Sequence, residues 1–242
     1  SKSQSDAIRQ NHVQTMTYFD TFGKHNLTVM AGHEYYYTKT TYLDAYANGI
    51  FTPEIPELNA SAKVQNGSSY VSEYNVEGFF GNAQYNYDEK YFASASYRRD
   101  ASSRFAKENR WGNFWSVGGA WLINHENFME DVAWVDQLKF KASIGQQGND
   151  NIGNWAYTDL YSLTPVSNSQ MSASFYRIGN PDITWETTTN FNIGLEFGLF
   201  NNRLSGSIDY YNKKTTDLLF WLSVPESAGS RGYYGNIGDI RN

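Results

Sequence analysis

The stretch ETTTNFNIGLEFG, residues 186–198, decides the fold class. Its odd-numbered positions from Thr187 to Phe197 carry Thr, Thr, Phe, Ile, Leu and Phe, whereas its even-numbered positions carry Glu, Thr, Asn, Asn, Gly and Glu. A period of two predicts a β-strand with one apolar and one polar face. After Asn201 and Asn202 the alternation resumes in LSGSIDYY, residues 204–211, so the two segments together predict a β-hairpin.

The same period predicts six further strands. In one of them Leu138, Phe140, Ala142 and Ile144 alternate with lysines and a serine. We expect these strands at 12–22, 27–39, 75–87, 90–100, 113–122 and 137–147. The chain is therefore predicted to be all-β, with about eight antiparallel strands.

The composition excludes several functional classes. Aromatic residues make up 17% of the 242 residues, which is too many for a disordered chain. The net charge of −6 disfavours nucleic acid as a partner, since that function normally needs a basic face. The chain has no cysteine, which excludes disulfides and thiolate metal sites. No apolar run approaches about 18 residues, so no transmembrane helix is expected.

The expected connections alternate between short and long. Tight turns are expected at Lys24–His25, Asp88–Glu89 and Asn201–Asn202, and 123–136 could hold one helical turn around Glu126–Asp131. The other connections are long and rich in Gly, Ser, Asn and Tyr, at 41–73, 101–112, 148–185 and 216–236. In an up-and-down sheet this places every long loop at one end. Such sorting is typical of outer-membrane barrels, whose strands need only about 9–11 residues to cross the bilayer.

Aromatic residues lie mostly towards the ends of the expected strands, as at Tyr85, Tyr87, Tyr91 and Trp121. Tyr and Trp favour the membrane–water interface because each ring has an apolar and a polar end. Composition alone favours the alternative that these aromatic residues fill the core of a soluble β protein. The sorting of the loops by length favours the transmembrane β-barrel.

Several blocks of the sequence resemble the SusC-like, or starch-utilisation-type, TonB-dependent transporters. They occur in the order and spacing of that family from about residue 74 onward, whereas the first 73 residues match only in general character. The blocks are YNYDEKYFASASYRRDASSRF (85–105), FWSVGGAWLINHENFMED (114–131), LKFKASIGQQGN (138–149), GNPDITWETTTNFNIGLEFGLFNNRLSGSIDYYNKKTTDLL (179–219) and NIGDIRN (236–242).

The resemblance implies a bacterial outer-membrane protein whose long loops are extracellular. It implies a plugged barrel of about 22 strands that imports nutrients, typically oligosaccharides or peptides. The implied partners are the TonB complex, acting through the plug, a SusD-like surface lipoprotein and outer-membrane lipid. The sequence has no plug, TonB box, signal peptide or final strand of that family. Residues 1–242 are therefore expected to be the central part of the barrel domain.

About eight strands of a larger barrel need neighbours, because unpaired backbone groups are costly in hydrocarbon. An eight-stranded barrel closed on itself is the alternative. Two other functional hypotheses remain open at this stage. One is a secreted soluble β protein that binds carbohydrate through aromatic loops, and the other is a passive porin or surface adhesin.

No catalytic or metal-binding constellation stands out. His125 and Glu126 begin a zinc-protease motif, but position 129 is Met rather than His. The stretch GNDNIGN, residues 148–154, lacks the spaced carboxylates and closing Glu of a calcium loop, so a polar turn is expected. We therefore expect no enzyme activity, no cofactor and no metal.

Two sets of residues are candidates for functional contacts. Charges of the lumen or of the extracellular rim, expected to be paired, are Arg98, Arg99, Asp100, Arg104, Glu196 and Asp209. Aromatic side chains in or beside the long loops could stack on sugar rings, with loop packing or lipoprotein contact as the alternative for each. These are Trp155, Tyr157, Tyr161, Tyr176, Trp185, Tyr233 and Tyr234.

Overall fold

The computed structural model of the chain describes residues 1–167, 170–225, 227 and 229–242. Residues 168–169, 226 and 228, which belong to two of the expected long loops, lie outside the described residues. The described part is all-β, as predicted, and holds no helix with the length and hydropathy needed to cross a membrane. The strands are β1 Lys2–Phe22, β2 His25–Ile50, β3 Ser61–Tyr87, β4 Tyr91–Ser102, β5 Trp111–Leu122, β6 Val135–Asn149, β7 Leu160–Ser167, β8 Gln170–Arg177, β9 Glu186–Leu199, β10 Leu204–Thr216, β11 Leu219–Ser223, β12 Gly232–Asn236 and β13 Ile240–Arg241.

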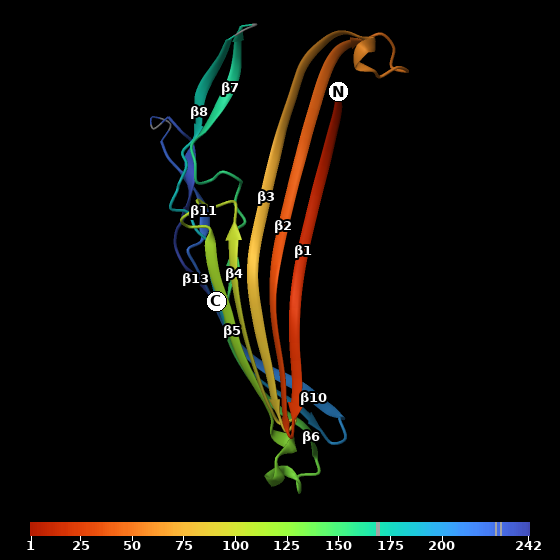
Figure 1. Cartoon of the computed structure of the whole chain (residues 1–242), viewed down its shortest axis with the longest axis vertical. Coiled ribbons are helices and arrows are strands. Elements are labelled where there is room, and N and C mark those ends of the chain that lie inside the picture. Colours follow the sequence, from red (N-terminus) through yellow and green to blue (C-terminus); the bar gives the residue numbers. More distant parts are fainter. Residues whose placement is uncertain (168–169, 226, 228) are drawn as a thin grey trace.

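The main sheet is antiparallel and follows an up-and-down path. Its strand order is β1-β2-β3-β4-β5-β6-β9-β10-β13, with β1 and β13 as its edges (Figure 1). Within the described residues the sheet is thus open, and the alternative of a small self-closed barrel is wrong. The connections 23–24, 88–90, 123–134 and 200–203 lie at one end of the sheet, at the bottom of Figure 1, and 51–60, 103–110, 150–185 and 217–239 lie at the other. The sorting by length is incomplete, because 123–134 is longer than 51–60 and 103–110.

The turns have the backbone geometry that their sequences favour. Asp88 and Glu89 both have positive φ, at 54° and 52°, as the type I′ hairpin turn requires. Asn201 and Asn202 also have positive φ, at 59° and 57°, and asparagine tolerates this region better than most residues. The expected helical turn within 123–136 is present as two short 3-10 turns, η2 (Ile123–His125) and η3 (Asn127–Met129).

The first three strands are much longer than predicted. β1 begins at Lys2 rather than at residue 12, and the expected loop 41–73 shrinks to residues 51–60, which include the 3-10 turn η1 (Leu58–Ala60). Side-chain alternation is lost wherever both faces of a strand meet water, although the backbone ladder continues. The prediction of loop 41–73 was wrong for this reason.

Two of the expected long loops contain strands that pair only with each other. β7 and β8 form a hairpin within 148–185, and β11 and β12 form a hairpin within 216–236. Neither hairpin was predicted, because their exposed residues show no sustained apolar period.

The main sheet has two chemically different faces. Phe191, Ile193 and Leu195 of β9 lie on the convex face, in register with Ile144, Ala142 and Phe140 of β6. Phe191 is 39% exposed, and in the described part of the chain no second layer covers this face. The soluble alternative required this apolar ridge to be buried against a second layer, so that alternative is wrong.

Aromatic rings line the short-turn end of the convex face. Tyr91 stacks between Tyr87 and Trp121, with ring centroids 6.2 and 6.3 Å apart. Glu126, in the β5–β6 connection, accepts hydrogen bonds from the Tyr91 hydroxyl and from Trp121 Nε1, the latter at 2.9 Å. Lys90 Nζ lies 3.6 Å from the same carboxylate. One carboxylate therefore ties together the start of β4, the end of β5 and the β3–β4 turn.

We expect Glu126→Gln to destabilise the protein at pH 7 and to have less effect in acid. The hydrogen bonds from Tyr91 and Trp121 hold the pKa of Glu126 below its usual range. A lowered pKa in the folded state means that stabilisation is complete above the unfolded pKa of about 4.3 and is lost as the pH falls through the folded pKa. The denaturation midpoints of the two proteins, measured from pH 7 to pH 3, should therefore converge.

Glu89→Gln, in the adjacent β3–β4 turn, is the matched control and should change the midpoint little at any pH. A constant difference between wild type and Glu126→Gln across this range would contradict the assigned role of the carboxylate.

Candidate functional site on the concave face

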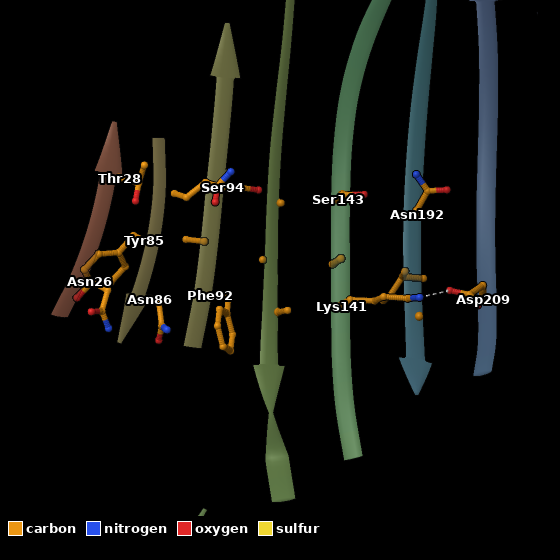
Figure 2. Close-up of a pocket in the computed structure, with 18 of the residues that line it drawn as sticks. Asn26, Thr28, Tyr85, Asn86, Phe92, Ser94, Lys141, Ser143, Asn192 and Asp209 are labelled. Carbon is orange, nitrogen blue, oxygen red and sulfur yellow. Dashed lines mark ion pairs between the residues drawn. The ribbon is translucent and has the colours of Figure 1, made fainter. Parts of the chain in front are cut away.

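The concave face of the sheet holds a hollow of about 820 Å³ in its short-turn half. Amide and hydroxyl side chains from neighbouring strands point into it, as Figure 2 shows. The even positions of β9 supply Asn192, which is in register with Ser143 of β6. This polar wall also includes Asn26, Thr28, Gln84, Asn86, Ser94, Lys141 and Asp209. Such a surface is suited to water and to polar partners.

An ion network crosses the hollow. Lys141 Nζ lies 2.7 Å from Glu196 Oε1 and 3.0 Å from Asp209 Oδ1, the latter contact being drawn in Figure 2. Lys141 and Asp209 are separated by β9, where Gly194 is in register with both. A Cβ at Gly194 would lie 2.3 Å from Asp209 Oδ1 and 2.5 Å from Lys141 Cε. The glycine therefore allows the ion pair to reach across the strand.

A second ion network lies nearer the long loops on the same face. Arg98 Nη2 is 2.8 Å from Glu34 Oε2, and Arg98 Nε is 2.8 Å from both oxygens of Asp100. Here too a glycine lies between the charges, since Gly78 of β3 is in register with Glu34 and Asp100. A Cβ at Gly78 would lie 2.2 Å from Asp100 Oδ1.

The segment after β6 is tied to β3 and β4 by a half-buried polar cluster. Asp150 Oδ2 accepts hydrogen bonds from Ser102 Oγ at 2.6 Å and from the Tyr74 hydroxyl at 2.7 Å. Arg104 Nη1 donates to the Asp150 carbonyl at 3.0 Å, and its guanidinium lies 4.2 Å from the centre of the Tyr74 ring. Burial, followed by the bond to Asp150, raises the pKa of Tyr74 far above its usual value.

The polar residues of 148–154 form hydrogen bonds with other parts of the sheet. Asn154 Nδ2 donates to Ser72 Oγ at 3.1 Å and to the Glu73 carbonyl at 3.0 Å. Asn154 and Asp150 together hold the segment that follows β6 against β3, so that this segment passes β4 and β5. The polar side chains of this stretch thus bond to protein groups, and the described residues contain no cluster of metal-ligating side chains.

The apolar core of the described chain lies where the long connections pack on the concave face. Phe105 is completely buried, and its ring lies 5.4 Å from that of Trp185. Trp185 also packs edge-on against Phe114 of β5 and donates from Nε1 to the Arg110 carbonyl at 2.8 Å. The other members are Ile152, Ala156 and Ile183. The long connections therefore form a packed layer rather than separate loops.

These features agree with a comparison to a known family. The model of the family described as "TonB dependent receptor-like, beta-barrel" matches residues 2–242, which is almost the whole chain. The chain belongs to this family. Its sheet is part of a TonB-dependent receptor barrel in the bacterial outer membrane, and the family is not one of enzymes.

Relatives and solved structures support the same conclusion. The TonB-dependent receptor P3 of Formosa agariphila is 32% identical over all of this chain and 24% of its own length. TonB-dependent receptor SusC of Bacteroides thetaiotaomicron is 32% identical over 93% of this chain and 23% of its own length. A structure of the RagAB peptide transporter aligns with a TM-score of 0.92 at 31% identity, covering 99% of this chain and 27% of that chain. The chain thus spans about a quarter of these relatives.

In a TonB-dependent receptor barrel the convex face meets lipid and the concave face forms the lumen wall. Glu196, Asp209, Arg98 and Asp100 lie on the concave face, and Arg104 lies on the same side at the long-loop end, so their assignment as charges of the lumen or rim stays a prediction. Arg99 does not join Arg98 and Asp100, because successive side chains of a strand point to opposite faces. Arg99 was expected to be paired like the other charges, and in the described part of the chain it has no carboxylate partner.

The aromatic candidates occupy different environments. Trp185 is only 9% exposed and belongs to the core, so little of its indole can contact a ligand. Tyr157 and Tyr234 pack against that core, and Tyr233 is half-buried on β12. Three of the seven are well exposed at the long-loop end, namely Trp155, Tyr161 and Tyr176.

Glu34, Tyr74 and Asp150 belong to the site but were not predicted from the sequence. Glu34 and Tyr74 occupy even-numbered positions of β2 and β3, which face the concave side. This alternation is the sequence signal by which they could have been found. The partners of Asp150 lie on strands distant in sequence, so only the tertiary structure brings them together.

Proposed function

We propose that this chain forms part of the wall and outer loops of a transporter that imports oligosaccharides or peptides across the outer membrane. Similarity to SusC and to the RagAB peptide transporter over nearly the whole chain supports this class of cargo. The observation that carries the proposal is the division of one sheet into an apolar lipid face and a polar, ion-paired luminal face.

In this proposal, residues 1–242 are a central part of the barrel domain. The edges at β1 and β13 support it, because unpaired strand edges are not stable in hydrocarbon and require neighbouring strands. The plug occupies the lumen beside the amide- and hydroxyl-rich wall, and the TonB complex acts on that plug. A SusD-like surface lipoprotein covers the long-loop end, where the cargo enters.

Uptake measurements on cells that carry the full-length gene test the proposal. A labelled oligosaccharide or peptide should accumulate only in cells with the gene, and accumulation should stop when the proton-motive force is dissipated. Uptake that continues without energy would indicate a passive porin, and cell binding without any uptake would indicate an adhesin. Either result would overturn the proposed function.

We expect Trp155→Ala to weaken cargo binding by roughly 2- to 13-fold, because an aromatic contact contributes about 0.5–1.5 kcal/mol beyond area burial. Trp155 is 51% exposed at the long-loop end and available for stacking. Trp134→Ala is the matched control, since Trp134 is 53% exposed but lies at the opposite, short-turn end. Titration of the full-length protein with cargo should show a loss for the first variant only.

A further inference from the structure

Arg98 and Arg99 are adjacent in sequence but meet different surroundings. Arg98 faces the lumen and is paired with Glu34 and Asp100 at 2.8 Å. Arg99 is exposed on the lipid-facing side, in register with Phe79 of β3 and Asn113 of β5. In the described part of the chain, no carboxylate oxygen lies within the 4 Å that would make an ion pair with Arg99.

Two other cations on the lipid-facing side of this end have carboxylate partners. Lys39 Nζ lies 2.9 Å from Glu73 Oε1, and Lys214 Nζ lies 2.9 Å from Asp239 Oδ2. Arg99 differs from them in having only an aromatic contact, with its Cζ 4.9 Å from the centre of the Trp111 ring.

The position of Arg99 along β4 places it at the outer border of the apolar band. It lies about 27 Å along the strand from Tyr91 of the short-turn belt, at about 3.4 Å per residue. A strand tilt of about 40° reduces this to a height of about 21 Å, close to the roughly 25 Å of the apolar band of such barrels. The ring of Phe79 stacks on Trp111 beside it, at 6.4 Å, as expected for an interfacial aromatic belt.

A second hydrogen-bond donor lies next to Arg99. Asn113 Oδ1 accepts from the Tyr97 hydroxyl at 2.8 Å, which directs the Nδ2 hydrogens of this exposed amide away from Tyr97. Residues directly opposite in an antiparallel pair have Cβ atoms about 4.5–5.5 Å apart, so one acceptor group can reach both side chains.

We propose that Arg99, Trp111 and Asn113 form a binding site for the phosphate of an anionic lipid headgroup in the outer leaflet. A guanidinium donates two parallel hydrogen bonds to a phosphate, and its aliphatic stem can lie along apolar surface while the charge stays at headgroup level. Trp111 holds the guanidinium against the barrel wall, and the bound phosphate supplies the negative charge that the protein itself does not. The site is separate from the lumen and independent of the cargo.

The test uses the purified full-length protein and counts retained lipids by native mass spectrometry after exchange into phosphatidylglycerol or phosphatidylcholine. Arg99→Gln should lower phosphatidylglycerol retention about tenfold, as expected for the loss of a charge-assisted hydrogen bond. It should lower phosphatidylcholine retention less, because that headgroup carries the same phosphate but no net negative charge. Arg99→Lys should lower it less, because lysine keeps the charge but not the two parallel bonds.

Lys107→Gln is the matched control, since Lys107 is an exposed cation of the β4–β5 connection at the same end of the sheet. An equal loss of phosphatidylglycerol in this control, or no loss in Arg99→Gln, would overturn the proposal. Inorganic phosphate that displaces the lipid at equal concentration would also overturn it, because the site would then be one for free anions. An unchanged melting temperature in detergent establishes that the variants are folded.

Discussion

Arginine at position 193 should destabilise the folded barrel by about 2–4 kcal/mol, whereas arginine at position 192 should change its stability little. Ile193 lies on the lipid-facing side in the middle of β9, in register with Ala142 and Tyr210. A charge there must enter hydrocarbon. Asn192 faces the polar hollow, where an added guanidinium remains in water.

The measurement is reversible urea unfolding of the full-length protein in lipid vesicles, comparing Ile193→Arg with Asn192→Arg. The two positions are adjacent on one strand, so secondary-structure propensity and depth are nearly equal between them. Equal stability of the two variants would show that the two faces of β9 do not meet different solvents, and the assignment of lumen and lipid sides would fail.

Phe105→Ala should destabilise the packed layer of long connections by about 3–5 kcal/mol, the usual cost of truncating a buried aromatic side chain. Phe105 has no exposed surface and packs against Trp185 at the centre of the apolar core. Because the strands beneath are held by their own backbone ladder, we expect the loss to appear as local opening. Hydrogen exchange in residues 103–110, 150–159 and 178–185 should accelerate, while exchange in β4 and β5 should change less.

Phe51→Ala provides the control for this prediction, since Phe51 lies at the same end of the sheet but is 89% exposed. It should leave exchange in all three connections unchanged. If Phe105→Ala also had no effect, the long connections would not form one packed unit, and the rigid layer assigned to the concave face would be wrong.

The parts of the strands that cross the bilayer could be predicted well, and the parts that extend beyond it could not. The hairpin of β9 and β10 was predicted to begin at Glu186, where it does begin. β2, in contrast, continues to Ile50, well past its expected end at residue 39. Hydrogen bonds between backbones hold the outer part of β2, and backbone pairing leaves no periodic trace in the side chains when both faces are wet.

The candidate site was predictable in its residue types but not in its contacts. Glu196 and Asp209 were predicted to be paired charges of the lumen or rim, yet their shared partner Lys141 reaches Asp209 only because Gly194 lies between them. In the same way, Trp185 was predicted from the sequence to be a candidate for ligand contact, whereas it packs against Phe105 and Phe114 in the core. Whether a side chain is buried depends on which residues, distant in the sequence, pack against it.

The amino-acid order alone therefore determined the fold class, the two faces of the sheet and the end at which the long connections lie. These properties are local, because alternation and turn chemistry act over neighbouring residues. Only the tertiary structure decided which charges pair and which aromatic rings remain free. Those properties depend on strand register, and register brings together residues such as Tyr74 and Asp150 that no local pattern connects.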